Sequence, residues 1–284
     1  MALYGVDLDH MEAAHFERRG PVAIVTLNRP ESANALNTAM HRDVGACWNE
    51  INENDEIRAA VVTGAGRFFC AGRDLNEYVG QYGSGDTSAL RPIDDPDHEM
   101  FGRLCNHWIL RKPLVGALNG PAVGGGLEMV TMVDIIVMAE DTYILDAHAK
   151  VNVGSGDVMY HYLPPMIARA FTMTDRRLSA EECLRWGFAS DVVPRDRVLP
   201  RAIEIAEATT RMGPDAIAKL KQRSIELQLR SGNVRPPEEL EERRKTRREL
   251  IRQTASDHDR MEGMRAFVEG RAADYERPAR PDVP

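Results

Sequence analysis

The stretch "GPAVGGGLEM", residues 120–129, places three consecutive glycines directly before a run that has the pattern of a helix. Glycine weakens regular structure, because it loses more backbone entropy than other residues and offers no side chain for packing. A helix N-terminus gives these glycines a purpose, since its first N–H groups are unpaired and carry partial positive charge. Without side chains in the way, a substrate oxygen can approach these N–H groups, as in an oxyanion hole.

A carboxylate follows the glycines at a spacing that suits proton transfer. Glu128 lies three residues after Gly125, about one helical turn later, so both can face the same ligand. An oxyanion donor and a carboxylate within one turn predict proton transfer next to a carbonyl group. A structural role also fits, because glycines permit close packing of a helix on a strand and the helix dipole favours a first-turn glutamate.

A second glycine-rich corner occurs in "GRFFCAGRDLNE", residues 66–77, after a strand expected over 57–63. The run from Ala71 to Asp74 predicts a turn from strand into helix, with Asp74 as the N-cap. Two such corners on adjacent strands would supply two N–H donors to one oxygen.

Short apolar runs separated by helical segments predict an α/β sheet that is buried on at least one face. The first helical pattern runs from Asn37 to Ile51, and the chain after Pro200 has a helical pattern throughout. Glycine, proline and aspartate favour a surface loop over 77–98. The apolar runs lie at 20–30, 57–66, 113–120, 134–140 and 142–146.

The composition of the chain argues against several classes of protein. The chain has 284 residues, of which 43% are hydrophobic, and a net charge of −8, which argues against a general nucleic-acid binder. No apolar run reaches the ~20 residues that a membrane span needs. The first residues show no signal pattern, and the four cysteines have no CxxC spacing. We therefore expect a cytoplasmic protein with reduced thiols, no membrane segment and no metal site.

Five blocks in order along the chain together resemble the crotonase (enoyl-CoA hydratase/isomerase) superfamily, from about residue 14 to 275. The resemblance implies a spiral of ββα repeats over residues 1–198. It also implies a C-terminal helical region over residues 199–284 that serves oligomerisation, as a homotrimer or a hexamer of two trimers. The blocks are "VTLNRPESANALN", "VVTGAGRFFCAGRDL", "KPLVGALNGPAVGGGLEMVTMVDIIVMAE", "LSAEECLRWGFASDVVP" and "EGMRAFVEGRAADY".

The resemblance also implies a coenzyme A thioester substrate and no other cofactor. Its carbonyl oxygen would lie between the backbone N–H groups of Arg73 and Gly125, which would stabilise an enolate-like charge. Arg29 and Arg67 are candidates near the phosphates, although both also fit as solvated surface arginines. The remaining candidates for contacts with the substrate or its coenzyme A are Ala33, Ala71, Asp74, Leu75 and Gly124.

The sequence departs from the hydratase pattern at one catalytic position. Family hydratases use two glutamates, and Glu128 matches the first of them. The segment of the second reads "AHAKVNVGSGDVMY", residues 147–160, and places His148 at that position. A histidine can act as general acid or base near neutral pH, and Asp157, nine residues later, can orient its imidazole.

These residues leave several functions open. Glu128 and His148 can be the acid and base that add or remove water at a 2-enoyl-CoA. Alternatively, His148 and Asp157 can activate water for retro-Claisen C–C cleavage of a β-diketone or β-keto-acyl-CoA, or Glu128 can act alone, as in single-acid isomerases. A non-enzymatic scaffold or RNA-binding protein is supported only by the basic stretch 243–248, which has acidic neighbours. The retained Glu128 and the intact "AGRDL" favour coenzyme A thioesters.

Overall fold

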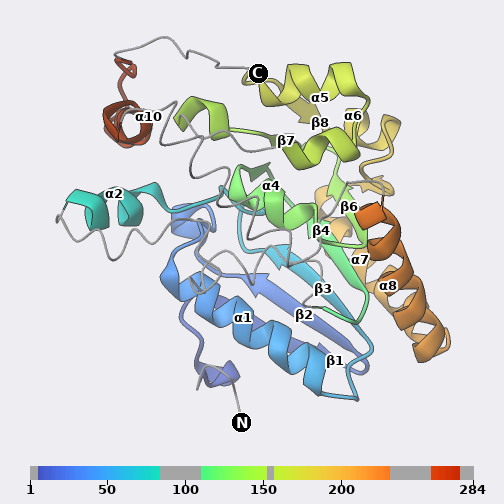
Figure 1. Ribbon diagram of the computed structural model, residues 1–284. Helices are drawn as coiled ribbons and strands as arrows, with labels where there is room; N and C mark the ends of the chain where they lie inside the picture. The colour runs from blue at the N-terminus through green and yellow to red at the C-terminus, as the bar shows by residue number, and fades with distance from the viewer. Residues whose placement is uncertain (1–5, 84–109, 152–156, 231–256, 276–284) are drawn as a thin grey trace.

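The computed structural model describes residues 6–83, 110–151, 157–230 and 257–275. Its strands form a six-stranded sheet in the order β1-β2-β3-β4-β6-β9 and a three-stranded sheet in the order β5-β7-β8 (Figure 1). The strands are β1 (Ala14–Arg19), β2 (Val22–Leu27), β3 (Ala59–Gly64), β4 (Leu114–Leu118), β5 (Ala122–Val123), β6 (Ile135–Ala139), β7 (Tyr143–Leu145), β8 (Arg177–Ser179) and β9 (Asp191–Val193).

Helices cover the sheets and connect their strands. The α-helices are α1 (Thr38–Glu53), α2 (Leu75–Gly83), α4 (Gly125–Val130), α5 (Pro165–Thr172), α6 (Ala180–Arg185), α7 (Val198–Thr210), α8 (Pro214–Arg230) and α10 (Asp257–Glu269). Short 3₁₀ helices are η1 (Leu8–His10), η2 (Pro30–Ser32), η3 (His148–Val151), η4 (Asp157–His161) and η5 (Arg195–Arg197).

The large sheet brings the two glycine corners together. Its first pair, β1 and β2, is antiparallel, whereas β2, β3, β4, β6 and β9 are parallel neighbours. The carboxyl ends of β3 and β4 therefore meet at the same edge, and the corners that follow these two strands lie there. Isolated β-bridges join Leu36 to Arg73 and Cys70 to Ala122.

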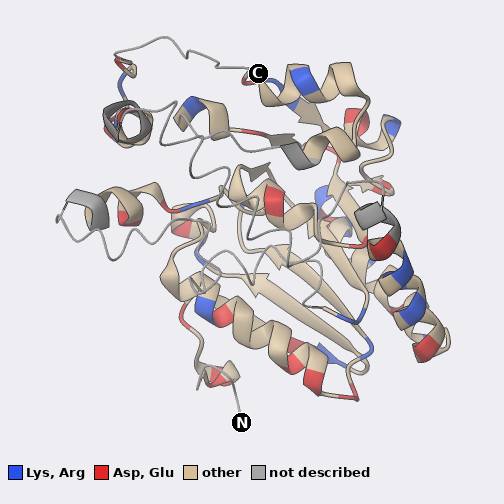
Figure 2. Cartoon of the chain, viewed as in Figure 1, with Lys and Arg blue, Asp and Glu red and all other residues tan. Residues whose placement is uncertain are grey.

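Both faces of the large sheet are buried by apolar packing, one against α1 and the other against α7. One face packs with α1, whose Met40, Trp48 and Ile51 are fully or almost fully buried. On the other face, Ala202 and Ala206 of α7 lie among strand residues, so α7 belongs to the sheet's layers although it falls within 199–284. The boundary at residue 198 stays a prediction. Figure 2 shows charged residues along α1 and α8, whereas the strands are mostly tan.

The structure confirms each apolar run as a strand and shows where the sequence patterns fall short. Strand β1 was not predicted, because "AHFERR" is polar and mostly solvent-facing along the antiparallel edge of the sheet. The loop expected over 77–98 is wrong at its start, where α2 extends to Gly83. Residues 84–98 lie outside the described residues. Within the described ranges, none of the helices combines the length and apolarity needed to cross a membrane.

Candidate active site

Two backbone nitrogens, of Arg73 and Gly125, lie side by side where the glycine corners meet. A Cβ atom on Gly125 would lie 3.6 Å from the Arg73 nitrogen, and one on Gly72 would lie 3.0 Å from the Gly125 nitrogen. Gly72 also has a left-handed φ of +89°, a conformation that L side chains rarely adopt. The structure thus brings together the two amides that the sequence singled out, with glycine where a side chain would intrude.

Backbone hydrogen bonds hold the two corners in register. The Asp74 N–H donates to Leu36 O, and Leu36 N–H donates in turn to Gly72 O. On the other corner, the Gly124 N–H donates to Leu145 O at 3.0 Å. These bonds occupy amides next to Arg73 and Gly125 and fix the direction in which each corner turns.

The Arg73 side chain is directed to α2. Its guanidinium carbon lies 4.4 Å from the centroid of the Tyr78 ring, in the geometry of a cation–π contact. An arginine at this position is therefore compatible with a role for its backbone N–H.

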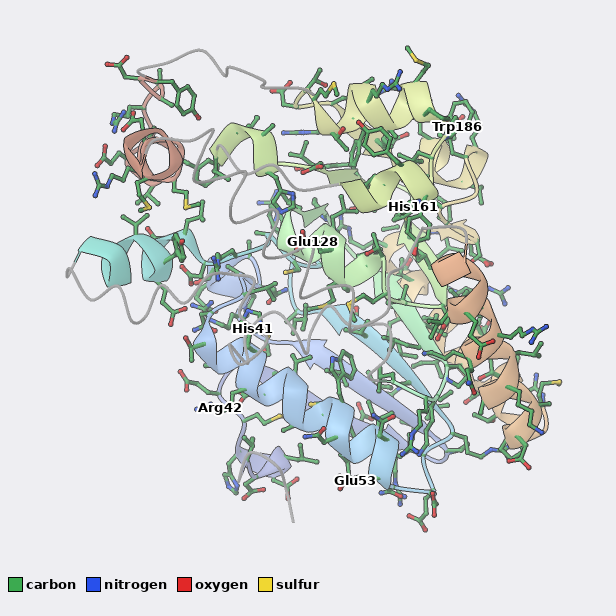
Figure 3. The ribbon with its side chains drawn as sticks, viewed as in Figure 1. His41, Arg42, Glu53, Glu128, His161 and Trp186 are labelled. Atoms are coloured by element: carbon green, nitrogen blue, oxygen red, sulfur yellow. The ribbon has the colours of Figure 1, made fainter. Side chains whose placement is uncertain are left out.

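Glu128 and His148 face one another beside this corner. Glu128 projects from α4 near the middle of the molecule (Figure 3), and its Oε1 lies 3.5 Å from His148 Nε2. A Cβ atom on Gly124 would lie 4.0 Å from the same Nε2. Both side chains are partly accessible, with 24% and 14% of their surface exposed. A carboxylate and an imidazole next to a pair of amides can exchange protons with a ligand bound there.

The carboxylate that contacts the other ring nitrogen of His148 belongs to Asp146. Its Oδ1 lies 2.6 Å from His148 Nδ1 and accepts the His148 backbone N–H at 3.1 Å. The sequence analysis assigned this orienting role to Asp157, whose side chain lies outside the described residues. It missed Asp146, which directly follows strand β7 in an Asp-Ala-His run.

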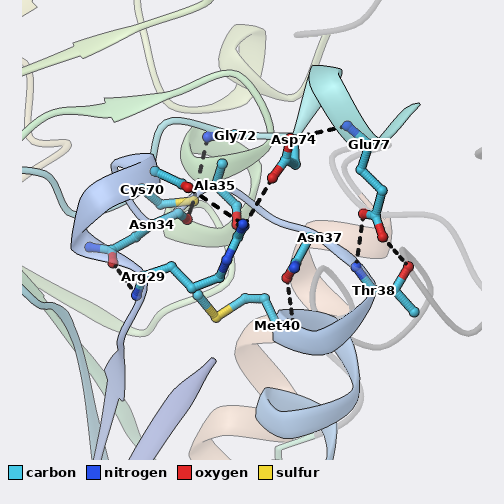
Figure 4. A network of polar contacts seen from close by, with 11 residues as sticks. Arg29, Asn34, Ala35, Asn37, Thr38, Met40, Cys70, Gly72, Asp74 and Glu77 are labelled. Atoms are coloured by element: carbon cyan, nitrogen blue, oxygen red, sulfur yellow. Dashed lines mark hydrogen bonds and ion pairs between the residues drawn. The ribbon is translucent and has the colours of Figure 1, made fainter. Parts of the chain in front are cut away.

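Two of the proposed coenzyme A contacts, Arg29 and Asp74, form part of a polar network that also includes Gly72 (Figure 4). Arg29 Nη1 donates to Asp74 Oδ2 at 3.0 Å and to Ala35 O at 2.7 Å, and both charged side chains are largely buried. Asp74 Oδ1 also accepts the Glu77 N–H, which fits its expected place as N-cap of α2. Arg29 therefore links the loop after β2 to the Arg73 corner, a role that the sequence did not indicate.

The other candidates divide into two groups. The Ala71 N–H donates to Ala33 O, so both belong to the same contact between loops, and Leu75 begins α2. Arg67 is exposed, and its carbonyl accepts from Arg195 Nη1 at 3.4 Å. The roles of these residues toward coenzyme A stay predictions.

Cys70 lies beside the Arg73 corner and is fully buried. Its Sγ donates to Asn34 O at 3.2 Å, and burial raises the pKa of the thiol to about 12. A protonated, inaccessible thiol is a poor nucleophile, so Cys70 packs the corner.

Comparison with known proteins gives consistent matches. The family model described as enoyl-CoA hydratase/isomerase matches residues 17–278. A carnitinyl-CoA dehydratase of Salmonella enteritidis is 36% identical over 222 residues, which cover 74% of this chain and 79% of the relative. A carnitinyl-CoA dehydratase of Citrobacter koseri is 35% identical over 220 residues, with the same coverage of both chains.

Solved structures resemble the whole described architecture. The crystal structure of a carnitinyl-CoA hydratase from Mycobacterium avium has a TM-score of 0.76 at 30% identity and covers 93% of this chain and 98% of its own. An enoyl-CoA hydratase from Mycobacterium smegmatis has a TM-score of 0.69 at 27% identity, covering 86% and 100%. The arrangement of the two sheets and their helices is thus that of these hydratases.

Proposed function

The chain belongs to the enoyl-CoA hydratase/isomerase family, and on this premise we propose that it adds water to a 2-enoyl-CoA thioester or removes water in the reverse direction. The observation that best supports this function is the placement of the Arg73 and Gly125 nitrogens side by side, with Glu128 and His148 next to them. The crotonase superfamily uses such a site to stabilise an enolate.

The two amides bind the thioester oxygen. As water adds, negative charge moves onto this oxygen, and N–H groups that already point at it stabilise the charge without reorganising. Each such donor contributes roughly 3 kcal/mol to lowering the barrier. The α4 N-terminus adds the partial positive charge of its first turn.

Glu128 and His148 divide the two proton transfers. In hydration, one of them takes a proton from water as its oxygen bonds to the β-carbon, and the other donates a proton to the α-carbon. Elimination reverses both steps. The pair holds one proton before and after the reaction, but on the other member. Transfer of that proton between Glu128 and His148, directly or through water, restores the starting state, so no cofactor besides the coenzyme A of the substrate is needed.

Finer features of the function follow from the same family resemblance. Ala33, Ala71, Asp74, Leu75 and Gly124 line the path of the substrate and its coenzyme A, and Arg29 and Arg67 lie toward its phosphates. The enzyme is a homotrimer or a hexamer of two trimers. Separately, the spacing of its cysteines supports the proposal that it works in the cytoplasm.

The other functions have less support. The relatives reported above carry the names of hydratases and dehydratases, which does not favour C–C hydrolysis. The basic stretch 243–248, which an RNA-binding role would need, lies outside the described residues.

Two variants test the acid–base pair on crotonyl-CoA as the first probe. Glu128→Gln and His148→Gln should each lower kcat by about 10²- to 10⁴-fold, because each removes one proton carrier. The exposed Glu140→Gln and His10→Gln are matched controls and should retain wild-type rates. Wild-type rates in both site variants would overturn the assignment.

Deuterium exchange then separates the two roles. Butyryl-CoA has no double bond to hydrate, yet its α-proton exchanges with D₂O if the hole and the α-carbon base are intact. The variant that loses this exchange has lost the group that serves the α-carbon. Exchange at the wild-type rate in both variants would contradict the assignment of Glu128 and His148 as the acid–base pair.

A further inference from the structure

We propose that Asp146 is the positioning residue of the site. It fixes the ring of His148, and it supplies the negative charge that is missing because a histidine replaces the glutamate at position 148. The proposal rests on the proposed function, in which His148 carries a proton. It concerns a residue outside the glycine corners and outside the acid–base pair.

The contact geometry gives the first argument. Asp146 is 1% exposed, and one of its oxygens, Oδ1, contacts both the Nδ1 and the backbone N–H of His148. Among the described residues, His148 is the one side chain with which Asp146 forms an ion pair, and its Oδ2 is buried with no hydrogen-bond partner. A buried carboxylate needs a compensating partner, so Asp146 and His148 depend on one another.

This contact determines which nitrogen can react. A carboxylate accepts hydrogen bonds, so Nδ1 bears the hydrogen that Asp146 binds. The lone pair or the exchangeable proton is then on Nε2, which lies 3.5 Å from Glu128 Oε1. Asp146 thus turns the useful nitrogen toward Glu128 and the glycine corner.

Charge gives the second argument. A glutamic acid is neutral before it donates a proton and carries −1 afterwards, whereas a histidine alone is +1 and then neutral. When an ionised Asp146 is hydrogen-bonded to His148, the two side chains together form a dyad that is neutral before donation and carries −1 afterwards. The Asp146–His148 dyad therefore has the same net charge as a glutamate in both states, although its negative charge lies on the far side of the imidazole from Glu128.

The fold ties this dyad to the oxyanion corner. Asp146 directly follows β7, and β7 pairs in parallel with β5, which leads into the glycines. The carbonyl of Leu145, one residue before Asp146, accepts the Gly124 N–H at 3.0 Å. The backbone that carries Asp146 is thus fixed to the backbone that carries Gly125.

The first test removes the charge and keeps the shape. Asp146→Asn should lower kcat on crotonyl-CoA by about 10²- to 10⁴-fold with little change in KM, because the charge is lost and the amide can donate to Nδ1, which stabilises the wrong tautomer of the imidazole. The control Asp43→Asn alters another fully buried aspartate, on α1, whose carboxylate binds the Glu12 and Ala13 amides. Asp43→Asn should lose about as much thermal stability as Asp146→Asn but should keep the wild-type kcat. Wild-type kcat in Asp146→Asn would overturn the proposal.

The second test exchanges the dyad for a glutamate. His148→Glu alone places a second carboxylate against Asp146, and their repulsion should disable the site. Adding Asp146→Asn removes that repulsion, so the double variant should be at least ~10-fold more active than His148→Glu. If Asp146 served stability alone, the second substitution would lower activity further, and that result would overturn the proposal.

A third measurement needs no substrate, and the one variant it uses serves only to assign a signal. In protein labelled with ¹⁵N-histidine, His148 is assigned by its loss in His148→Gln, and its Nδ1 should carry the hydrogen. A hydrogen on Nε2 alone would overturn the positioning role. This readout is independent of turnover, so it tests the Asp146 proposal by itself. Failure of the proposed hydratase function would instead appear as inactivity of the wild type on enoyl-CoA thioesters.

Discussion

At Gly72 the backbone is left-handed and the space beside it is occupied. A Cβ atom there would lie 2.7 Å from Val123 O, a distance that requires movement of the opposite corner. This position therefore tests whether the two corners act as one oxyanion hole.

We expect Gly72→Ala to lower kcat by about 10²- to 10³-fold, because movement of Val123 and Gly125 takes one amide out of line with the oxygen. Steady-state kinetics on crotonyl-CoA measure the effect. Gly187→Ala is the matched control, since Gly187 also has a positive φ, of +76°, but open space around it. Both variants should lose ~1–3 kcal/mol of stability from strain, and equal kcat values would contradict a shared hole.

Residue types and spacing predicted much of the site. The one-turn spacing predicted that Gly125 and Glu128 face one ligand, and the family resemblance pointed to Arg73 and His148. The structure brings all four residues together. Asp146 escaped prediction for a physical reason. Its importance comes from burial and from a turn that directs its carboxylate at His148, and neither property is visible in an Asp-Ala-His run.

At the scale of elements, the loop between β2 and α1 supports the Arg73 corner. Ala33 and Asn34 both adopt positive φ, and the Asn34 side chain is fully buried. Its amide donates to the carbonyls of Ala65, Phe68 and Phe69, while its oxygen accepts the Arg29 N–H. One side chain thus satisfies the backbone of two loops.

Asn34→Ala should therefore cost roughly 2–4 kcal/mol of unfolding free energy, since it leaves buried carbonyls and an amide unsatisfied. Urea unfolding measures this value. The control Asn37→Ala removes the N-cap of α1, one hydrogen bond to the Met40 amide, and should cost about 1 kcal/mol. A smaller loss in Asn34→Ala than in Asn37→Ala would contradict the bracing role.

Elements with strong patterns were predictable, and short ones were not. The helix expected from Asn37 begins at Thr38 with Asn37 as its cap, and the central strands lie within their apolar runs. Strands β8 and β9 have three residues each and are defined by their partners β7 and β6. Pairing of this kind depends on distant segments, which local sequence patterns do not encode.

At the scale of the whole molecule, buried ionisable groups make the free energy of unfolding depend on pH in the alkaline range. Tyr162 donates to Thr131 O at 2.8 Å at the end of α4, and burial raises the pKa of its phenol to about 12. Burial likewise raises the pKa of the Cys70 and Cys183 thiols to about 12. Each group remains protonated in the folded chain at pH values where it ionises in the unfolded chain.

The sign of the effect follows from this difference. The contribution of Tyr162 is fully present below its unfolded pKa of ~10 and is lost as pH rises toward its folded value; the thiols behave alike from ~pH 8.5 upward. The unfolding free energy should therefore fall between about pH 8.5 and about pH 12. Urea unfolding across this range measures it, and Tyr162→Phe should flatten the upper part of the curve. Tyr160→Phe is the control, and an identical curve for both variants would show that the buried phenol does not carry the effect.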